Sequence, residues 1–402
     1  MFESKNPLSF STDSTAVKLN QSSLNLGDKG NLNTSFPLGS SSASLGDEPS
    51  LQSEATAQSS NPIFKSPAIL ADFNGDGKTD KFWRNTQTGE TAVWLMDGTK
   101  VGNTGSLSKL DSNWNFDIAD FNRDGKTDLF WRNQATGTNM IWLMDGTRIG
   151  SETTVQPIDS NWTFDIADFN SDGRSDVFWR NQTTGENAVW LMDGTNITTS
   201  AFLPTVNSSW TYSIVDFNGD RKTDLFWRNK TTGENAVSFI DGTKANTYEL
   251  SKVDSSWDFI SGDFNGDSRT DILWRNSITG ENSMWLMNGT LIFGGNLSKM
   301  DTAWRPLIGD FNGDGKTDIF WRNDTTAEST AWLMDGTNVT TSTFLPKNNP
   351  SWKPSIGDFN NDGKTDIFWH NNTTGENAVW LMNNTTATGD YITTAPREWQ
   401  CF

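Results

Sequence analysis

Residues 72–80 carry oxygen atoms at a spacing that suits a metal ion. Carboxylate or amide side chains stand at positions 1, 3, 5 and 9 of this nine-residue segment, Asp72, Asn74, Asp76 and Asp80, and position 7 can offer its main-chain carbonyl. Hard oxygen donors at alternate positions of a tight loop suit Ca²⁺, which accepts about 6 to 8 oxygens in a flexible geometry. Mg²⁺ fits this pattern less well. The glycine at position 6 permits the positive φ that turns the oxygens inward.

An EF-hand loop begins in the same way but needs a bidentate glutamate at position 12 and flanking helices. Position 12 is Trp83 here, and it lies in a stretch that is typical of a strand. The metal would therefore have to be held by the aspartate at position 9.

The segment recurs seven times along the chain. The string Asp-Phe-Asn begins at residues 72, 120, 168, 216, 263, 310 and 358, at intervals of 47 or 48 residues. The seven copies hold 21 of the 50 acidic residues, which would repel one another at close range without a cation. Seven divalent ions would add fourteen positive charges and change the net charge from −19 to about −5. This favours metal binding over the alternative that the copies are only Asp-Asn-Gly surface turns.

The copies are unequal at position 6. Arg221 replaces the glycine in the fourth copy and Ser268 replaces it in the fifth. A side chain tolerates positive φ poorly. We expect these two loops to bind metal more weakly than the other five.

The elements that position these loops are predicted to be short strands. Apolar residues alternate with period two, as in Trp114, Phe116 and Ile118, and helical spacing is absent. The Asp-rich loop, a Thr-Gly-Glu turn and an Asp-Gly turn divide each copy into about four strands. Seven such copies predict an all-β fold, a seven-bladed β-propeller of four-stranded antiparallel blades over residues 61–402. A linear solenoid is the alternative.

One irregularity indicates how the ring closes. Six copies carry a tryptophan six residues before the first aspartate of the loop, but the first copy has Ser66 there. Trp399 follows Asp358 by 41 residues, and elsewhere the interval from this aspartate to the next tryptophan is 41 or 42. We predict that the C-terminal segment returns to the first blade and supplies the missing tryptophan.

Residues 1–60 differ in composition from the repeats. They are rich in Ser, Asn, Gly and Leu, show no sustained period and carry few aromatic residues. We expect a disordered arm, with a small folded cap as the alternative. The N-terminus lacks the layout of a secretory signal, and no stretch approaches the roughly 18 apolar residues that span a bilayer. We expect no membrane insertion, and the route of any export stays open.

The loop sequence, followed by Phe-Trp-Arg-Asn, resembles the FG-GAP/VCBS repeat family over about five-sixths of the chain. The family is similar to the propeller of integrin α subunits and to seven-bladed fungal lectins that contain calcium. The resemblance implies Ca²⁺ as cofactor, up to seven ions with one per blade, and a role in adhesion or glycan binding. It implies ligands at positions 1, 3, 5 and 9 of each loop and at the carbonyl of position 7. These residues are Asp72, Asn74, Asp76, Lys78 and Asp80; Asp120, Asn122, Asp124, Lys126 and Asp128; Asp168, Asn170, Asp172, Arg174 and Asp176; Asp216, Asn218, Asp220, Lys222 and Asp224; Asp263, Asn265, Asp267, Arg269 and Asp271; Asp310, Asn312, Asp314, Lys316 and Asp318; and Asp358, Asn360, Asp362, Lys364 and Asp366.

Twenty tryptophans recur at fixed places in the repeats, and two interpretations stay open for them. Their rings pack between diverging blades, or some form platforms for sugar rings with a neighbouring arginine as hydrogen-bond donor. Repeated sugar sites would bind weakly one by one and strongly together. The candidate ligand-binding residues are Trp83, Arg84, Trp94, Trp131, Arg132 and Trp142. Ser238 replaces a tryptophan in the fourth blade and His370 replaces the arginine in the seventh, so these blades should differ.

Composition narrows the function. The acidic balance disfavours nucleic acids and anionic membrane surfaces as partners. His370 and Cys401 are the only histidine and the only cysteine, which leaves little for nucleophilic catalysis and excludes an intramolecular disulfide. Six glutamates recur at the Thr-Gly-Glu turns and are more simply turn residues than a polysaccharide-cleaving pair.

We therefore expect a binding module rather than an enzyme. A glycan-binding, lectin-like role at the cell surface or outside the cell, where calcium is plentiful, comes first. A protein-binding adhesion or scaffold propeller with purely structural calcium is the alternative, and a polysaccharide-degrading enzyme is a distant one. The sequence identifies neither the ligand nor the oligomeric state.

Overall fold

The computed structural model describes residues 70–402. The arm predicted for residues 1–60 lies outside the described residues. Between residues 70 and 402 there is no helix long and apolar enough to cross a membrane.

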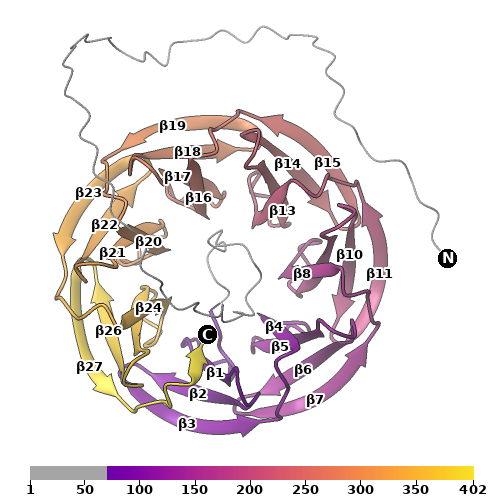
Figure 1. Ribbon diagram of the computed structural model, residues 1–402, viewed down its shortest axis with the longest axis horizontal. Helices are drawn as coiled ribbons and strands as arrows, with labels where there is room; N and C mark the ends of the chain where they lie inside the picture. The colour runs from indigo at the N-terminus through magenta and orange to yellow at the C-terminus, as the bar shows by residue number, and fades with distance from the viewer. Residues whose placement is uncertain (1–69) are drawn as a thin grey trace, which may run out of the picture. The chain divides into compact units, whose positions relative to one another are not determined.

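Seven four-stranded antiparallel sheets form a ring, which confirms the predicted propeller (Figure 1). We number the blades 1 to 7 along the chain and give the strands of each from the axis outward. They are β28 (Trp399–Cys401), β1 (Lys81–Asn85), β2 (Thr91–Asp97) and β3 (Lys100–Leu107); β4 (Trp114–Ala119), β5 (Asp128–Asn133), β6 (Asn139–Asp145) and β7 (Arg148–Val155); β8 (Trp162–Ala167), β9 (Asp176–Asn181), β10 (Asn187–Asp193) and β11 (Asn196–Leu203); β12 (Thr211–Val215), β13 (Asp224–Asn229), β14 (Glu234–Asp241) and β15 (Lys244–Leu250); β16 (Trp257–Gly262), β17 (Asp271–Asn276), β18 (Asn282–Asn288) and β19 (Leu291–Leu297); β20 (Trp304–Gly309), β21 (Asp318–Asn323), β22 (Ser329–Asp335) and β23 (Asn338–Phe344); and β24 (Trp352–Gly357), β25 (Asp366–Asn371), β26 (Asn377–Asn383) and β27 (Thr386–Ile392).

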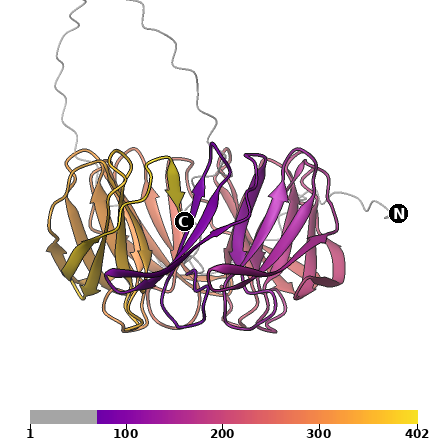
Figure 2. The same cartoon turned by 90° about the horizontal axis from the view of Figure 1, so that it is seen from below.

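The repeated loops lie at the same end of every blade. Loop 1 precedes β1, and loops 2 to 7 each join the innermost strand of a blade to the next strand. In the side view of Figure 2 they line the lower rim of the ring. The two-residue turn between the third and fourth strands, Gly98-Thr99 in blade 1, lies at this same rim, because two strands separate it from the loop and each strand reverses the direction of the chain. Gly98 has φ 60°, which is why glycine stands there.

The ring closes inside blade 1. Strand β28 pairs antiparallel with β1, with Cys401 opposite Trp83 and Trp399 opposite Asn85. The predicted seam is therefore confirmed, and it explains why a linear solenoid does not form. The seam also holds Lys81, a buried lysine that donates to Ser355 Oγ of blade 7 at 2.9 Å, where the other blades have leucine, valine or isoleucine.

Large aromatic rings fill the spaces between blades. Trp131 of β5 is fully buried and lies 4.9 Å from Trp142 of its own blade and 6.1 Å from Phe82 of blade 1, measured between ring centroids. Trp179 repeats this arrangement in blade 3 with Trp190 and Phe130. These rings hold neighbouring sheets together, as the packing interpretation of the tryptophans predicted.

Candidate metal sites

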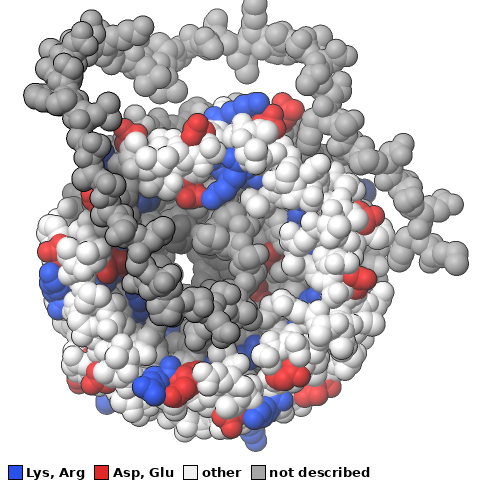
Figure 3. All heavy atoms as spheres, viewed as in Figure 1, with Lys and Arg blue, Asp and Glu red and all other residues white. Residues whose placement is uncertain are grey.

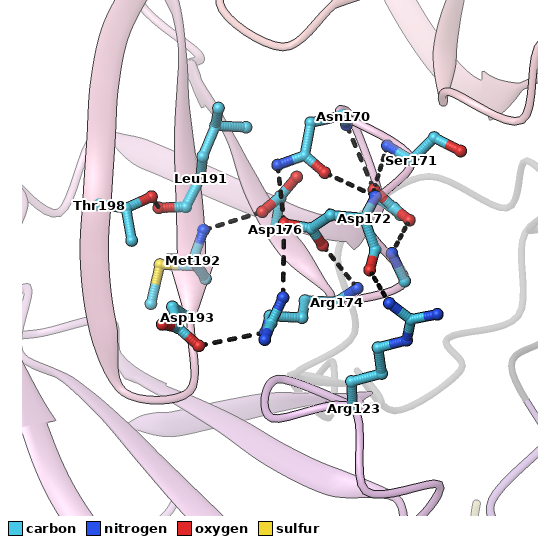
Figure 4. A network of polar contacts seen from close by, with 12 residues as sticks. Arg123, Asn170, Ser171, Asp172, Arg174, Asp176, Leu191, Met192, Asp193 and Thr198 are labelled. Carbon is cyan, nitrogen blue, oxygen red and sulfur yellow. Dashed lines mark hydrogen bonds and ion pairs between the residues drawn. The ribbon is translucent and has the colours of Figure 1, made fainter.

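Loop 3 shows how the acidic side chains fold each loop (Figure 4). Asp168 Oδ1 accepts the main-chain NH of Ser171 at 2.7 Å, and its Oδ2 accepts the NH of Gly173 at 2.8 Å. Asn170 Oδ1 accepts the NH of Asp172 at 2.9 Å, and Asp172 Oδ1 accepts the NH of Arg174 at 2.8 Å. Side chains at positions 1, 3 and 5 thus bend the chain back over themselves through short local hydrogen bonds.

The same bonds recur around the ring. In loop 1, Asp72 accepts the NH groups of Gly75 and Gly77 at 2.7 and 2.8 Å, and Asp76 accepts the NH of Lys78 at 2.9 Å. The bond from the position-7 NH to the position-5 carboxylate is present in all seven loops. The side chains at positions 1, 3 and 5 therefore accept main-chain NH groups within each loop, and their role as metal ligands stays a prediction.

The aspartate at position 9 joins the loop to the blade. Asp80 is fully buried; its Oδ2 accepts the NH of Phe73 at 2.8 Å and its Oδ1 accepts the NH of Met96 in β2 at 2.9 Å. Burial raises the pKa of Asp80 to about 7, and the nearby carboxylates of Asp72 and Asp76 contribute to this rise. The pKa of five counterparts, Asp128, Asp176, Asp271, Asp318 and Asp366, is raised to about 7 by the same causes.

Loop 4 differs at this aspartate. Asp224 is fully buried and its Oδ1 accepts the NH of Ile240 at 3.0 Å, while its Oδ2 makes no hydrogen bond of normal geometry among the described residues. Burial raises its pKa to about 8, although the NH of Phe217 is near enough to lower this pKa slightly. A buried carboxylate oxygen without a well-placed donor is costly, and a bound cation would satisfy it.

In loops 1, 2, 3, 4 and 6 the basic side chain at position 7 reaches the aspartate of the neighbouring turn. Lys78 Nζ lies 2.8 Å from Asp97 Oδ1 and 3.8 Å from Asp76 Oδ2. Arg174 Nε lies 3.1 Å from Asp193 Oδ1 in loop 3.

In loops 5 and 7 the basic side chain at position 7 pairs instead with the position-5 carboxylate of its own loop, Arg269 with Asp267 at 3.0 Å and Lys364 with Asp362 at 3.5 Å. Only the main-chain carbonyl of position 7 can serve as a metal ligand, since these side chains are cationic.

The donor set of each loop fits a hard cation, because it offers carboxylate and amide oxygens. Within residues 70–402 no three acidic, histidine or cysteine side chains converge as a preformed metal cage. The carboxylates accept main-chain NH groups instead, so metal binding at these loops stands as a prediction.

Each loop needs positive φ at two positions, not one. Gly75 and Gly77 have φ of 73° and 80° at positions 4 and 6 of loop 1. Loops 2, 3 and 7 carry Arg123, Ser171 and Asn361 at position 4, with φ between 57° and 60°. The expectation drawn from position 6 alone did not include these three loops, because their departure lies at position 4.

Comparison with known proteins places the chain in a family. A family model described as an FG-GAP-like repeat matches residues 72–131, 120–179, 168–227, 216–274, 263–321 and 310–369, together more than half of the chain. The chain belongs to the FG-GAP-like repeat family. No curated protein sequence matches it.

Solved structures share the architecture of this FG-GAP propeller. Prolyl oligopeptidase B from Galerina marginata, bound to a 35-residue substrate, gives a TM-score of 0.51 at 12% identity, over 80% of this chain and 50% of that one. The dihydro-heme d1 dehydrogenase NirN gives 0.50 at 9% identity, over 82% and 68%. At these identities the likeness shows the fold alone.

The FG-GAP arginines, predicted as sugar contacts, lie inside the blade junctions. Arg84 donates to the carbonyl of Asp111 at 2.7 Å and to that of Trp114, and its guanidinium lies over the ring of Trp131 in blade 2. Arg132 makes the same contacts with Asp159, Trp162 and Trp179 one blade further. Each arginine fastens its blade to the next through main-chain carbonyls and a cation–π contact.

The six candidate ligand-binding residues of this FG-GAP ring are therefore mostly inaccessible. Trp83, Trp131, Trp142, Arg84 and Arg132 are buried, and Trp94 is half-buried against Trp83 with ring centroids 4.7 Å apart. A sugar would reach the five buried side chains only if a blade junction opened.

The two departures among the FG-GAP blades have local explanations. His370 takes the place of the arginine and faces Trp83 across the seam, with ring centroids 5.4 Å apart, while its Nδ1 lies 2.7 Å from Asn377 Oδ1. Ser238 Oγ accepts the indole NH of Trp227 at 2.9 Å.

The recurrent glutamates confirm their predicted role in turns. Thr88 Oγ1 donates to Glu90 Oε2 at 2.9 Å, and five other repeats have the same bond.

The hydroxyl at position 8 was overlooked in the sequence, although all seven copies carry threonine or serine there. Thr127 Oγ1 accepts the NH of Asp72 from the preceding blade at 2.7 Å. The sequence does carry a signal for it, because a hydroxyl residue recurs between the predicted ligand positions 7 and 9 in every copy.

Proposed function

We propose that this FG-GAP ring is a calcium-stabilised binding module that takes up to seven Ca²⁺ ions, one per blade. The supporting observation is the ring of buried position-9 aspartates. Their pKa values are raised to about 7 or 8 by burial and by the neighbouring carboxylates of the same loop. Near neutral pH these carboxyls are costly to ionise, and a divalent cation in each loop would offset that cost.

The residues that would hold each ion are those predicted from the repeats. In loop 1 they are Asp72, Asn74, Asp76 and Asp80 through side-chain oxygens, with the carbonyl of Lys78. When bound, Ca²⁺ would supply charge neutralisation and cross-link the loop to the start of β1. The role proposed for the metal is structural, since each loop is tied to its own blade and to the next.

The partner proposed is a glycan bound outside the cell or at its surface. Support comes from three outer strands that each carry an exposed aromatic ring at the same register: Phe202, Phe344 and Tyr391, which are 49%, 70% and 70% exposed. Each ring also lies beside a tryptophan of its own blade. Rings at repeated positions suit stacking against sugar rings and multivalent binding.

The outer strands that carry these rings are mainly uncharged. On the face drawn in Figure 3, acidic and basic side chains are scattered among uncharged ones. The three outer strands are rich in threonine and serine. Hydroxyl groups beside an aromatic ring suit a neutral, polyhydroxylated ligand better than a charged one.

We propose a binding module and not an enzyme, because the two side chains best suited to nucleophilic catalysis are buried or protonated. His370 is buried and bonded to Asn377, and Cys401 has a pKa raised to about 11 by burial, so neither is prepared as a base or nucleophile.

A glycan array tests the partner. Calcium-loaded protein should bind at least one array member, and Phe344→Ser together with Tyr391→Ser should weaken binding, since other blades carry polar residues at this register. Thr199→Val, at an exposed position on the opposite face of the outer strand β11, is the control. An array on which nothing binds would remove the glycan and leave a protein partner as the module's ligand.

A further inference from the structure

We propose that the seven loops bind Ca²⁺ cooperatively, each loop stabilising the next one around the closed ring. This inference rests on the proposed function, because it concerns how the same loops fill with metal. It is carried by hydrogen bonds that join every loop to the following one.

The first link joins position 1 of one loop to position 8 of the next. Thr127 NH donates to the carbonyl of Asp72 at 2.7 Å, and Asp72 NH donates back to Thr127 Oγ1 at 2.7 Å. The main-chain bond is present at all seven junctions, at 2.6 to 2.8 Å. The hydroxyl bond is present at five of them. Thr79 and Asp358 make both bonds across the seam, so the chain of links has no end.

The second link runs through position 2. Phe73 NH donates to the buried Asp80 of its own loop at 2.8 Å, while the carbonyl of Phe73 accepts the NH of Gly146 from the turn of blade 2 at 2.8 Å. All seven junctions have this second bond, with Asn384 in place of glycine in blade 7. In the six loops other than loop 4, the residue at position 2 therefore bonds both to the buried carboxylate of its own loop and to the next blade.

A third link exists at two junctions. Arg123 Nη1 donates to the carbonyl of Asp172 at 2.8 Å, and Asn361 Nδ2 donates to the carbonyl of Asp76 at 3.3 Å. Both side chains come from position 4 and reach position 5 of the next loop. Two of the non-glycine residues with positive φ therefore contribute contacts between loops.

These links connect ligand positions of neighbouring sites. Position 1 supplies a carboxylate to one site, and position 8 lies between the position-7 carbonyl and the position-9 carboxylate of the next. An ion that fixes Asp72 also fixes Thr127, and with it Lys126 and Asp128. The next ion then has fewer groups left to order when it binds, so it loses less conformational entropy and binds more tightly. This is positive cooperativity between neighbouring sites. In loop 4, the buried Oδ2 of Asp224, which makes no hydrogen bond of normal geometry, separately supports a bound cation.

The test removes one site and observes the others. Asp76→Ala takes a ligand from loop 1, and Glu90→Ala removes an acid of the same blade from the turn between β1 and β2, at the opposite end of the blade, as the matched control. Calorimetric Ca²⁺ titration of the whole chain should show one site fewer in Asp76→Ala. The mean Kd of the remaining sites should rise about fivefold or more. The control should leave both quantities unchanged.

A second variant keeps every ligand in place. Thr127→Val removes only the hydroxyl that bonds to Asp72, and Thr199→Val removes an exposed hydroxyl away from the loops. Thr127→Val should bind as many ions as the native protein with a raised mean Kd, and Thr199→Val should match the native protein.

The outcomes separate the two claims. If the native chain binds Ca²⁺ and both loop variants leave the other sites unchanged, the loops are independent and the inference is overturned while the proposed function stands. If the native chain binds no Ca²⁺, both are overturned.

Discussion

Asp80 and its counterparts connect the chemistry of the loops to the blades. Each is fully buried, and Asp80 accepts main-chain NH groups from its own loop and from the third strand of its blade. A bound cation would favour the ionised form of the Asp80 carboxyl group.

Backbone strain distinguishes the loops at the level of single residues. Loops 1 and 6 have glycine at both positions with positive φ, while each of the other five has one side chain there. The expectation that only loops 4 and 5 depart from the rest was therefore too narrow. Their weaker metal binding stays a prediction.

Arg221→Gly should stabilise the protein by about 1 kcal/mol, since a left-handed conformation costs a non-glycine residue roughly that much. Arg221 is exposed and has φ 65°. Denaturant unfolding measures the change. Gly125→Ala is the reverse control, because Gly125 has φ 76° and a methyl group added there would meet no other atom within 4 Å. An unchanged or lower free energy of unfolding in Arg221→Gly would contradict the strain argument.

At the scale of strands, the junctions between blades explain the composition of the repeat. Arg84 and Arg132 each bind the turn that leads into the next blade and lie over that blade's tryptophan. At the seam this role falls to His370, which is shorter and bonds to Asn377.

His370→Arg should strengthen the seam. The longer side chain can reach the carbonyls of Pro396 and Trp399, which correspond to those of Asp111 and Trp114 at the first junction. Charge-assisted bonds of this kind contribute about 1.5 to 3 kcal/mol. The melting temperature should rise, and amide exchange in β28 should slow. A fall in melting temperature would show that the seam has no room for arginine.

Deleting residues 396–402 should lower the melting temperature sharply. The deletion removes β28, exposes one edge of β1, and takes away Phe402, whose ring lies 4.9 Å from that of Phe116 in blade 2. Gln400→Ala, at an exposed position of the same strand, is the control. A melting curve unchanged by the deletion would show that the ring does not depend on this seam.

Loop, blade and seam could be predicted from the sequence, because each depends on residues close together in one repeat or on one missing tryptophan. Contacts between repeats could not be predicted in this way. Periodicity shows that Arg84 recurs, but it does not show that Arg84 meets Asp111 in the next blade. The hydroxyl of Thr127 and the φ of Arg123 depend in the same way on neighbours that only the assembled ring provides.

At the scale of the whole molecule, the ring repeats one junction seven times, including the junction between the two ends of the ring. Its net charge of −19 is concentrated in part in the loops on one rim. The stability of the ring should therefore depend on what neutralises these loops.

Without calcium, the protein should lose stability as the pH rises. The position-9 aspartates have folded-state pKa values of about 7 or 8, above the value of 3.8 expected when unfolded. A raised pKa means that their stabilising contribution is present below about pH 4 and is lost as the pH rises through 7 to 8. Melting temperatures in chelator should fall between pH 5 and about pH 8, and saturating Ca²⁺ should remove this fall. A flat profile in chelator would contradict it.

The most direct test of calcium binding is the metal content of the whole chain. Protein stripped with chelator is dialysed against about 1 mM Ca²⁺, and the bound metal is counted by mass spectrometry, with Mg²⁺ in a parallel sample. The account predicts up to seven Ca²⁺ per chain, one for each loop, and much less Mg²⁺. Less than one Ca²⁺ per chain would contradict it.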